Sequence, residues 1–325
     1  MTDKILITGA TGFIGSHLAE LCVEKGLNVV AFDRYNPNNS WGWLENSKYN
    51  KDMKIILGDI RDYDSVFKAM KGCNKIFHLA ALIGIPYSYV SPLAYIRTNL
   101  EGTYNVIESA KSYNLDQILI TSTSETYGSA KYIPMDEKHD LVGQSPYAAS
   151  KIAADQLALS YYLSFNLPIK IIKPFNTFGP RQSLRAIIPT IITQALNNKK
   201  EIILGNLSPT RDFLYVKDTC RSFIEISKSK KLFGEVINVG TKTEISIEKL
   251  AKKILKIMDL KLKIKKETIR SRPKKSEVDR LCCENKKILK TTKWKPSYSL
   301  ESGLRETIEW FRDFHDSNKT NIYHI

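Results

Sequence analysis

Residues 4–15 read KILITGATGFIG, an apolar run followed by glycines at every third position. The run predicts a short strand over Lys4–Thr8, and the pattern after it predicts a helix to about Lys25. Glycines in such a turn let the backbone approach a pyrophosphate, and the N-terminus of the helix offers free N–H groups to its oxygens. The stretch therefore predicts the first unit of a dinucleotide-binding sheet, against the alternative of a glycine turn with no cofactor.

A carboxylate ends the next predicted strand, Asn28–Asp33. Asp33 follows Gly15 by 18 residues, a spacing that places its carboxylate against the adenosine ribose of a dinucleotide. This favours NAD over NADP, because a carboxylate disfavours a 2′-phosphate, although the adjacent Arg34 weakens the preference. The cofactor residues expected from this part of the chain are Gly9, Thr11, Gly12, Phe13, Ile14, Gly15, Asp33 and Arg34.

Alternating strands and helices continue to about Ile172. Further strands are expected at Met53–Leu57, Lys75–Ala81 and Gln117–Thr121, and long helices at Ser91–Tyr113 and Tyr147–Phe165. This alternation is typical of the α/β class and predicts a Rossmann-type doubly wound parallel sheet over residues 1–172. Residues 173–325 also mix strands and helices, including Ile245–Met258 and Leu300–Phe314. They predict a smaller mixed α/β lobe over the substrate.

Hydroxyl and carboxyl side chains follow the strand that ends at residue 121. Thr123, Ser124 and Glu125 are expected at the carboxyl end of a parallel strand, where open α/β sheets bind their ligands. The next predicted helix places Tyr147 and Lys151 four residues apart on one face. An ammonium beside a phenol stabilises the phenolate and provides a base near neutral pH. The alternatives are a Ser/Thr-rich turn and an ordinary surface Tyr/Lys pair.

Composition excludes several other classes of protein. The chain of 325 residues has no apolar run of about 20 residues, so no membrane-spanning helix is expected. Its start does not read as a signal peptide, and its five cysteines form no CxxC pair, which indicates the cytoplasm and no metal site. The net charge of +15 comes from scattered lysines without a nucleic-acid motif. We therefore expect neither a nucleic-acid nor a membrane partner, but an anionic substrate.

Several motifs occur in the order seen in one known family. They read TGATGFIG, GDIRD, HLAA, NLEGT, YAASK, KPFNTFGPR, RDFLYVKD and INVG. With them, the chain resembles the extended short-chain dehydrogenases/reductases, and among these the enzymes of nucleotide sugars. One departure is Lys173, which stands where Arg is usual and keeps the charge. The resemblance implies that the chain crosses back to the first domain after residue 173, and that the two long helices pair with a second subunit in a homodimer.

The motifs and the resemblance together extend the list of site residues. For the cofactor they add Asp59, Ile60, Leu79, Ala80, Ala81, Asn99, Thr121, Tyr147, Lys151 and Lys173, whereas His78 is expected in the core. For the substrate they indicate Tyr87, Thr123, Asn176, Arg181, Arg185, Arg211, Arg272 and Glu277. Guanidinium groups pair well with diphosphate oxygens. A surface salt bridge is an equally good interpretation of any single arginine.

The triplet Thr123-Ser124-Glu125 bears on the subclass but does not decide it alone. It resembles the triplet of the 4,6-dehydratases, whereas simple 4-epimerases usually lack the acid; UDP-glucuronate decarboxylases also carry Ser-Glu. The stretches ALIGIPYSYVSPLAY and GNLSPTRDF resemble the N-acetylglucosamine 4,6-dehydratases of legionaminic acid pathways, with GDP preferred over UDP as the nucleotide. The alternatives are a 4-epimerase, a UDP-glucuronate decarboxylase and a protein that only senses NAD.

The resemblance implies a mechanism in which oxidation precedes elimination. Oxidation of C4 by NAD makes the C5 proton acidic, with Tyr147 and Lys151 taking the 4-hydroxyl proton and Thr123 bonding the 4-oxygen. Glu125 removes the C5 proton, and Ser124 or Glu125 assists departure of the 6-hydroxyl. Hydride then returns to C6, so the net redox change is zero and the cofactor is retained.

Overall fold

The computed structural model describes residues 3–197, 200–267 and 273–314. Their largest element is a seven-stranded parallel sheet with the order β10-β6-β5-β4-β1-β2-β3. The strands are β1 Lys4–Thr8, β2 Asn28–Arg34, β3 Met53–Gly58, β4 Lys75–His78, β5 Gln117–Thr121, β6 Ile169–Pro174 and β10 Val236–Val239. The expected Rossmann-type α/β class is confirmed.

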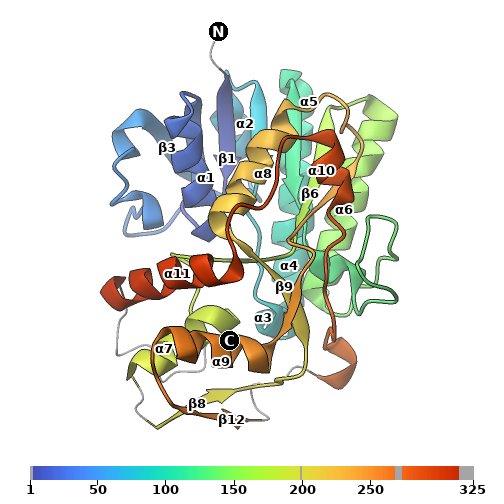
Figure 1. Ribbon diagram of the computed structural model, residues 1–325. Coiled ribbons are helices and arrows are strands. Elements are labelled where there is room, and N and C mark those ends of the chain that lie inside the picture. The colour runs from blue at the N-terminus through green and yellow to red at the C-terminus, as the bar shows by residue number, and fades with distance from the viewer. Residues whose placement is uncertain (1–2, 198–199, 268–272, 315–325) are drawn as a thin grey trace.

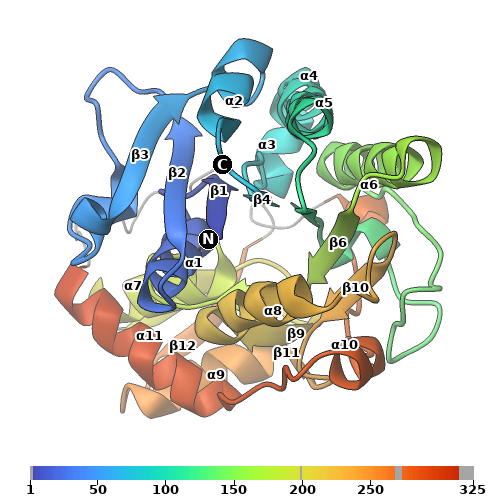
Figure 2. The same ribbon diagram turned by 90° about the horizontal axis from the view of Figure 1, so that it is seen from above.

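Helices cover both faces of this sheet (Figure 2). On one face lie α2 (Tyr63–Met70), α5 (Gly102–Tyr113) and α6 (Pro146–Phe165), and on the other α1 (Phe13–Glu24) and α8 (Val216–Lys228). Alternate residues of each strand enter opposite cores: Ile5 and Ile7 pack with the α1 side, and Leu6 with the α2 side. A sheet buried on both faces needs such continuously apolar strands.

The second half of the chain contributes to the large sheet as well as to a lower layer (Figure 1). Strand β10 pairs with β6, so the chain does return to the first sheet after residue 173. Two small sheets, β11-β9-β7 and β12-β8, lie below the ends of the large sheet. Their strands are β7 Asn176–Phe178, β8 Glu201–Leu204, β9 Thr210–Tyr215, β11 Glu244–Ser246 and β12 Lys263–Lys266.

The remaining helices frame the lower layer and the space above it. They are α3 Ile85–Val90, α4 Pro92–Tyr95, α7 Ile187–Asn197, α9 Ile247–Ile257, α10 Lys286–Thr291 and α11 Leu300–Phe314. Within the described residues, no helix combines the length and apolar character needed to cross a membrane. The same residues contain no group of three or more potential metal-binding side chains. All five cysteines are buried and free.

Two predicted elements differ from the structure. Strand β4 ends at His78, so the predicted strand residues 79–81 lie in the loop beyond it. The predicted helix Ser91–Tyr113 consists of α4, a π-helical segment at Ile96–Glu101 (η3) and α5. The wider turns of η3 accompany the packing of this segment against α6. A pattern of apolar residues over six positions does not distinguish the two helix types.

Candidate functional site

A cleft of about 1250 Å³ lies between the large sheet and the lower layer. Its lining includes the end of β2 and the loops after β1, β3, β4 and β5, all at the carboxyl ends of parallel strands, where α/β folds bind ligands. Most of the predicted cofactor and substrate residues line it. They are Gly9, Gly12, Phe13, Ile14, Gly15, Asp33, Arg34, Asp59, Ile60, Leu79, Ala80, Ala81, Tyr87, Thr121, Thr123, Ser124, Glu125, Tyr147, Lys151, Asn176, Arg185, Arg211 and Glu277.

The glycine turn at one end of the cleft has no space for side chains. Gly9 has a φ of +71°, and a Cβ on it would lie 2.8 Å from the backbone nitrogen of Ala80. A Cβ on Gly15 would lie 2.0 Å from the carbonyl oxygen of Gly9. The turn therefore brings the N-terminus of α1 close to β1 and leaves its N–H groups facing the cleft, as an anion site requires.

Asp33 is held in place at the end of β2. Its Oδ2 accepts hydrogen bonds from the backbone nitrogen and the hydroxyl of Thr11, both at 2.7 Å. Its Oδ1 accepts from the backbone nitrogen of Arg34 at 2.7 Å. The carboxylate thus has a fixed orientation beside the glycine turn, where a ribose hydroxyl would donate to it. Thr11 reaches the cleft only through Asp33, since it does not line the cavity itself.

The predicted catalytic side chains come together at the end of β5. Thr123 caps the short 3-10 helix η4 (Ser124–Tyr127), and its Oγ1 accepts from the backbone nitrogen of Glu125 at 3.3 Å. The Thr123 side chain also hydrogen-bonds the Tyr147 phenol. Helix α6 begins at Pro146 with Ser145 as its cap, and it directs Tyr147 and Lys151 at the same strand end. Tyr147 is 7% exposed and Glu125 9%.

Burial dominates the electrostatics of this group. Burial raises the pKa of Tyr147, the hydrogen bond with Thr123 lowers it, and the Glu125 carboxylate raises it further. The Lys151 ammonium donates to the backbone carbonyl of Thr121 at 2.5 Å, and burial lowers its pKa. Burial thus outweighs the lowering of the phenol pKa that the sequence predicts. A positive charge beside the phenol is needed to make Tyr147 a base near neutral pH.

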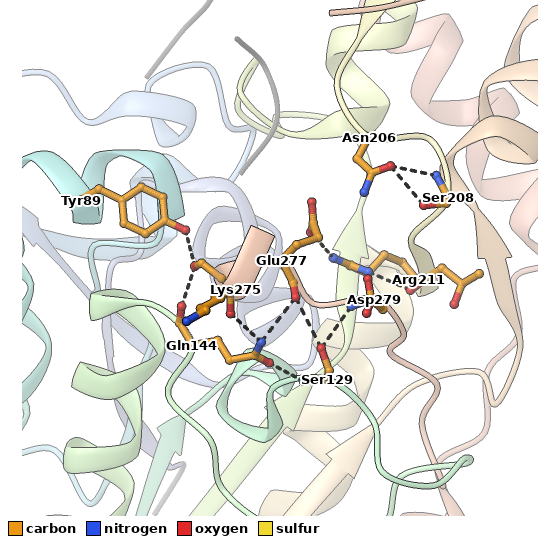
Figure 3. Close-up of polar contacts among 11 residues, drawn as sticks. Tyr89, Ser129, Gln144, Asn206, Ser208, Arg211, Lys275, Glu277 and Asp279 are labelled. Atoms are coloured by element: carbon orange, nitrogen blue, oxygen red, sulfur yellow. Dashed lines mark hydrogen bonds and ion pairs between the residues drawn. The ribbon is translucent and has the colours of Figure 1, made fainter. Parts of the chain in front are cut away.

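Residues 275–279, which we call the strap, cross the other end of the cleft (Figure 3). Ser276 bonds the Tyr89 hydroxyl at 2.6 Å and the backbone carbonyl of Gln144 at 2.5 Å. The Gln144 amide donates to the backbone carbonyl of Lys275 at 3.1 Å. Tyr89 belongs to α3, whereas Gln144 precedes α6, so the strap ties together segments far apart in the chain.

Arg211 forms an ion pair with Glu277 of the strap. Arg211 Nη2 lies 3.5 Å from Glu277 Oε1, and both side chains are largely buried. Both residues line the cleft, as does Asn206, whose Oδ1 accepts from the Ser208 hydroxyl at 3.1 Å. A buried guanidinium on the wall of a cavity is suited to bind an anionic group. This end of the cleft therefore carries a guanidinium together with the carboxylate of Glu277, whereas the other end carries the N–H groups of the glycine turn.

Three predicted site residues lie behind the walls of the cleft. Asn99 bonds the backbone of Leu82 and the hydroxyl of Ser150. Arg181 forms a two-pronged ion pair with Glu20, at 3.0 Å for each nitrogen, so the salt-bridge interpretation describes it. Lys173 pairs with Asp155. None of the three lines the cavity. Arg272 lies outside the described residues.

Other residues in and around the cleft were not predicted as site residues from the sequence. Gln144 and Ser129 hydrogen-bond the strap, and Ser276 is the strap residue that bonds Gln144 in return. Gln182 lines the cleft next to Arg181, which the sequence indicated instead. Among the described residues, Thr121, Asn176 and Gln182 line the cleft and each keeps a buried side-chain oxygen without a hydrogen-bond partner. Such groups fit a ligand that supplies polar partners.

The fold and the cleft define a Rossmann-type protein with a Tyr/Lys pair at a dinucleotide site. A profile of the family described as GDP-mannose 4,6 dehydratase matches residues 6–307. The chain belongs to this family.

Its relatives have several activities. The chain is 30% identical over 328 residues to the human dTDP-D-glucose 4,6-dehydratase, covering 96% of this chain and 91% of that one. It is 31% identical over 338 residues to a UDP-N-acetyl-alpha-D-glucosaminuronate decarboxylase of Bacillus cytotoxicus, covering 96% and 99%.

The solved structures that are similar to this chain also include more than one activity. A UDP-N-acetylglucosamine 4-epimerase of Methanobrevibacter ruminantium, in complex with UDP-N-acetylmuramic acid, superposes with a TM-score of 0.86 at 30% identity, covering 97% of this chain and 100% of that one. A dTDP-glucose 4,6-dehydratase of Streptomyces venezuelae with NAD bound gives 0.87 at 25% identity, covering 95% and 97%. The family is shared, whereas the reaction differs among its members.

Proposed function

We propose that this protein is an NAD-dependent 4,6-dehydratase of a nucleoside-diphosphate N-acetylglucosamine. Family membership and the NAD-bound neighbour support the cofactor, and the fixed Asp33 carboxylate and the glycine turn fit it. One observation carries the choice of reaction: Glu125 lies on the same wall of the cleft as Thr123 and Tyr147. A second acid/base group beside the phenol is what elimination requires and 4-epimerisation does not.

The roles of the side chains follow from the chemistry. When bound, NAD supplies the hydride acceptor for C4 and the hydride donor for C6. Tyr147 accepts the 4-hydroxyl proton in the field of Lys151, and Thr123 donates to the 4-oxygen as charge develops on it. Glu125 removes the C5 proton, which is acidic once C4 is a ketone. Ser124 or Glu125 protonates the departing 6-hydroxyl.

The cleft also suggests how the substrate binds. We assign the diphosphate to Arg211 and Arg185, and the ribose to Glu277. The sugar lies between Tyr87 and the end of β5, near Asn176. We propose GDP over UDP as the nucleotide and legionaminic acid synthesis in the cytoplasm as the pathway, both from sequence resemblance. In this division, residues 1–172 bind the cofactor and residues 173–325 mainly bind the substrate.

We further propose a homodimer through the face formed by α4, η3, α5 and α6. In the single chain this face exposes large apolar side chains, which are Leu93, Ile96, Tyr104, Leu163 and Phe165. Such a patch is unusual on a monomer. Light scattering on the wild type and on Leu163→Glu tests it: a dimer that the substitution dissociates is expected, and a monomeric wild type contradicts it.

A product assay tests the reaction. Purified protein without added cofactor is offered GDP-N-acetylglucosamine, UDP-N-acetylglucosamine and UDP-glucuronate, and the products are analysed by mass spectrometry. Loss of water from an acetamido sugar nucleotide is expected. Loss of carbon dioxide from the glucuronate, or a 4-epimer of unchanged mass, would assign the site to the decarboxylase or the epimerase.

Glu125→Gln separates the two steps. Without the base for C5, dehydration is expected to fall about 10²–10⁴-fold. Oxidation of C4 does not need Glu125, so absorbance of reduced NAD at 340 nm still appears when substrate is added. Glu309→Gln is the matched control, because Glu309 is an exposed carboxylate of α11 that pairs with Arg312 and does not line the cleft. Equal losses in both variants would contradict the role of Glu125.

A further inference from the structure

Three charged side chains are buried together behind the wall that carries Tyr147. Lys173 Nζ on β6 lies 3.4 Å from Asp155 Oδ2 on α6, and both side chains are 2% exposed. Lys151, one turn before Asp155 on α6, is buried as well. Buried ion pairs are often no more stabilising than apolar side chains of the same volume. Stability alone therefore does not account for this cluster.

Asp155 connects the cluster to the end of β5. Its Oδ2 also accepts a hydrogen bond from the Ser122 hydroxyl at 2.5 Å. Ser122 directly follows Thr121, whose backbone carbonyl accepts from the Lys151 ammonium at 2.5 Å. The carboxylate therefore fixes the strand end that positions Lys151. As a consequence, the negative charge of Asp155 lies near Tyr147 and Lys151, where the proton is transferred.

That negative charge opposes the chemistry unless it is compensated. The Asp155 carboxylate raises the pKa of both Tyr147 and Lys151, and the Lys173 ammonium lowers that of Lys151. A phenolate at Tyr147 is favoured by net positive charge beside it. With Lys173 present, one carboxylate faces two ammonium groups. Without Lys173, the carboxylate would cancel the charge of Lys151.

The other ionisable groups around the cluster do not replace Lys173. Glu125 and Tyr95 face Tyr147, and both raise its pKa. His78 is near Lys151, but burial lowers its pKa to about 3, so it is neutral. Glu137 is near Lys173 and negative, and the ring of Tyr127 lies 4.4 Å from the Lys173 ammonium. Among these described groups, Lys173 is the compensating cation.

We propose that Lys173 is a positioning residue for proton transfer. It neutralises Asp155, so that Asp155 can anchor the end of β5 while Lys151 keeps its positive charge available to Tyr147. This differs from the direct contact with cofactor that the sequence suggested for Lys173. The inference depends on Tyr147 being the base of the proposed function. It does not depend on which sugar reaction follows, because oxidation at C4 is common to all three candidates.

Removing the positive charge of Lys173 and removing the negative charge of Asp155 should shift the pKa of Tyr147 in opposite directions. Lys173→Met leaves Asp155 uncompensated, and Asp155→Asn leaves Lys173 uncompensated while preserving an acceptor for Ser122. Tyr147 and Asp155 are eight residues apart on α6, or about 12 Å along the helix. At an effective dielectric constant of about 20, a unit charge at that distance shifts a pKa by about one unit. Lys173→Arg preserves the charge and is the matched control.

The first measurement is the pH profile of the hydride-transfer step. Reduction of bound NAD is followed at 340 nm in single-turnover experiments from pH 5 to 10. Lys173→Met is expected to move the profile up by about one pH unit and Asp155→Asn to move it down by about one. The double substitution, which removes both charges, should return it to the wild-type position, and Lys173→Arg should not move it.

The second measurement needs neither substrate nor cofactor. The ionisation of Lys151 is followed by NMR of ¹³Cε-labelled lysine, with Lys151→Met identifying its signal. Lys173→Met is expected to raise the pKa of Lys151, and Asp155→Asn to lower it. This NMR measurement can be interpreted even if the product assay finds no dehydratase activity.

Two results would overturn the proposal. One is a loss of rate with no shift in either single variant, which would indicate only structural support. The other is a pair of shifts in the same direction. If Lys173→Met does not fold, Asp155→Asn decides alone, because it retains the bond to Ser122; an unchanged profile and an unchanged Lys151 pKa in that variant refute the inference.

Discussion

The two ends of the cleft are built over very different distances in the chain. At the cofactor end, Thr11 donates a hydrogen bond to Asp33, which is 22 residues away in the sequence. At the strap, Gln144 hydrogen-bonds Lys275, which is 131 residues away in the sequence, and Tyr89 hydrogen-bonds Ser276, which is 187 residues away. The cofactor end is formed by regular strands and their glycine turn, whereas the substrate end is formed where α3, the loop before α6 and the strap meet.

This difference indicates how each end achieves its specificity. A turn between a strand and a helix presents backbone N–H groups, which suit the phosphates of any dinucleotide. Side chains from separate loops can be replaced one at a time, so the substrate end can change without disturbing the sheet. Relatives with dehydratase, decarboxylase and epimerase activities on one fold agree with this. Substitutions at the two ends should therefore affect different ligands.

Of the substitutions that test this difference, Gly15→Ala is expected to have the largest effect. Its Cβ would lie 2.0 Å from the Gly9 carbonyl oxygen, so the turn must open or α1 must move away from β1. Overpacking of this kind costs about 1–3 kcal/mol; if this cost falls on the NAD-bound turn, it corresponds to about a 5- to 150-fold loss of NAD affinity in titration calorimetry. Gly84→Ala is the control: the nearest atom to its Cβ is 3.5 Å away. Equal losses in the two variants would contradict the explanation.

A smaller effect is expected from Asp33→Asn. The amide keeps an acceptor for Thr11 but loses the charge that orders a ribose diol and disfavours a 2′-phosphate. We expect about a tenfold weaker affinity for NAD, a smaller preference for NAD over NADP, and an unchanged KM for the nucleotide sugar. Titration of both cofactors, with steady-state kinetics, measures all three. A change in KM alone would mean that Asp33 acts on the substrate end.

The same difference in chain distance governs what the sequence could predict. The strands β1, β2 and β5, the glycine turn and Asp33 were predicted closely, because each depends on neighbours within one strand–helix unit. Strand β4 was predicted too long, since apolar residues after His78 line a ligand cleft instead of a sheet. The local pattern of apolar residues thus predicts that a strand is present more reliably than it predicts where the strand ends.

Residues that depend on long-range packing could not be predicted in this way. The sequence places Lys173 on a strand, but only the fold shows that Asp155 faces it. Arg181 likewise has the charge that a phosphate site needs, yet α1 presents Glu20 to it. The roles of Gln144 and Ser276 come from bonds to backbone atoms of segments far away in the sequence. Such bonds leave no periodicity or spacing to detect.

The smallest effect is expected at the strap, from Ser276→Ala. The substitution removes the bonds to the Tyr89 hydroxyl and to the Gln144 carbonyl, and a hydrogen bond contributes about 0.5–1.5 kcal/mol net. If the strap holds the substrate end in shape, KM for the nucleotide sugar should rise about threefold while NAD affinity stays constant. Ser302→Ala, on the exposed part of α11, is the control. Combining Ser276→Ala with Tyr89→Phe should add less than the sum of the single effects, because both remove the same bond. Additive effects would contradict the role of this bond, and a loss of NAD affinity would show that the two ends of the cleft are not independent.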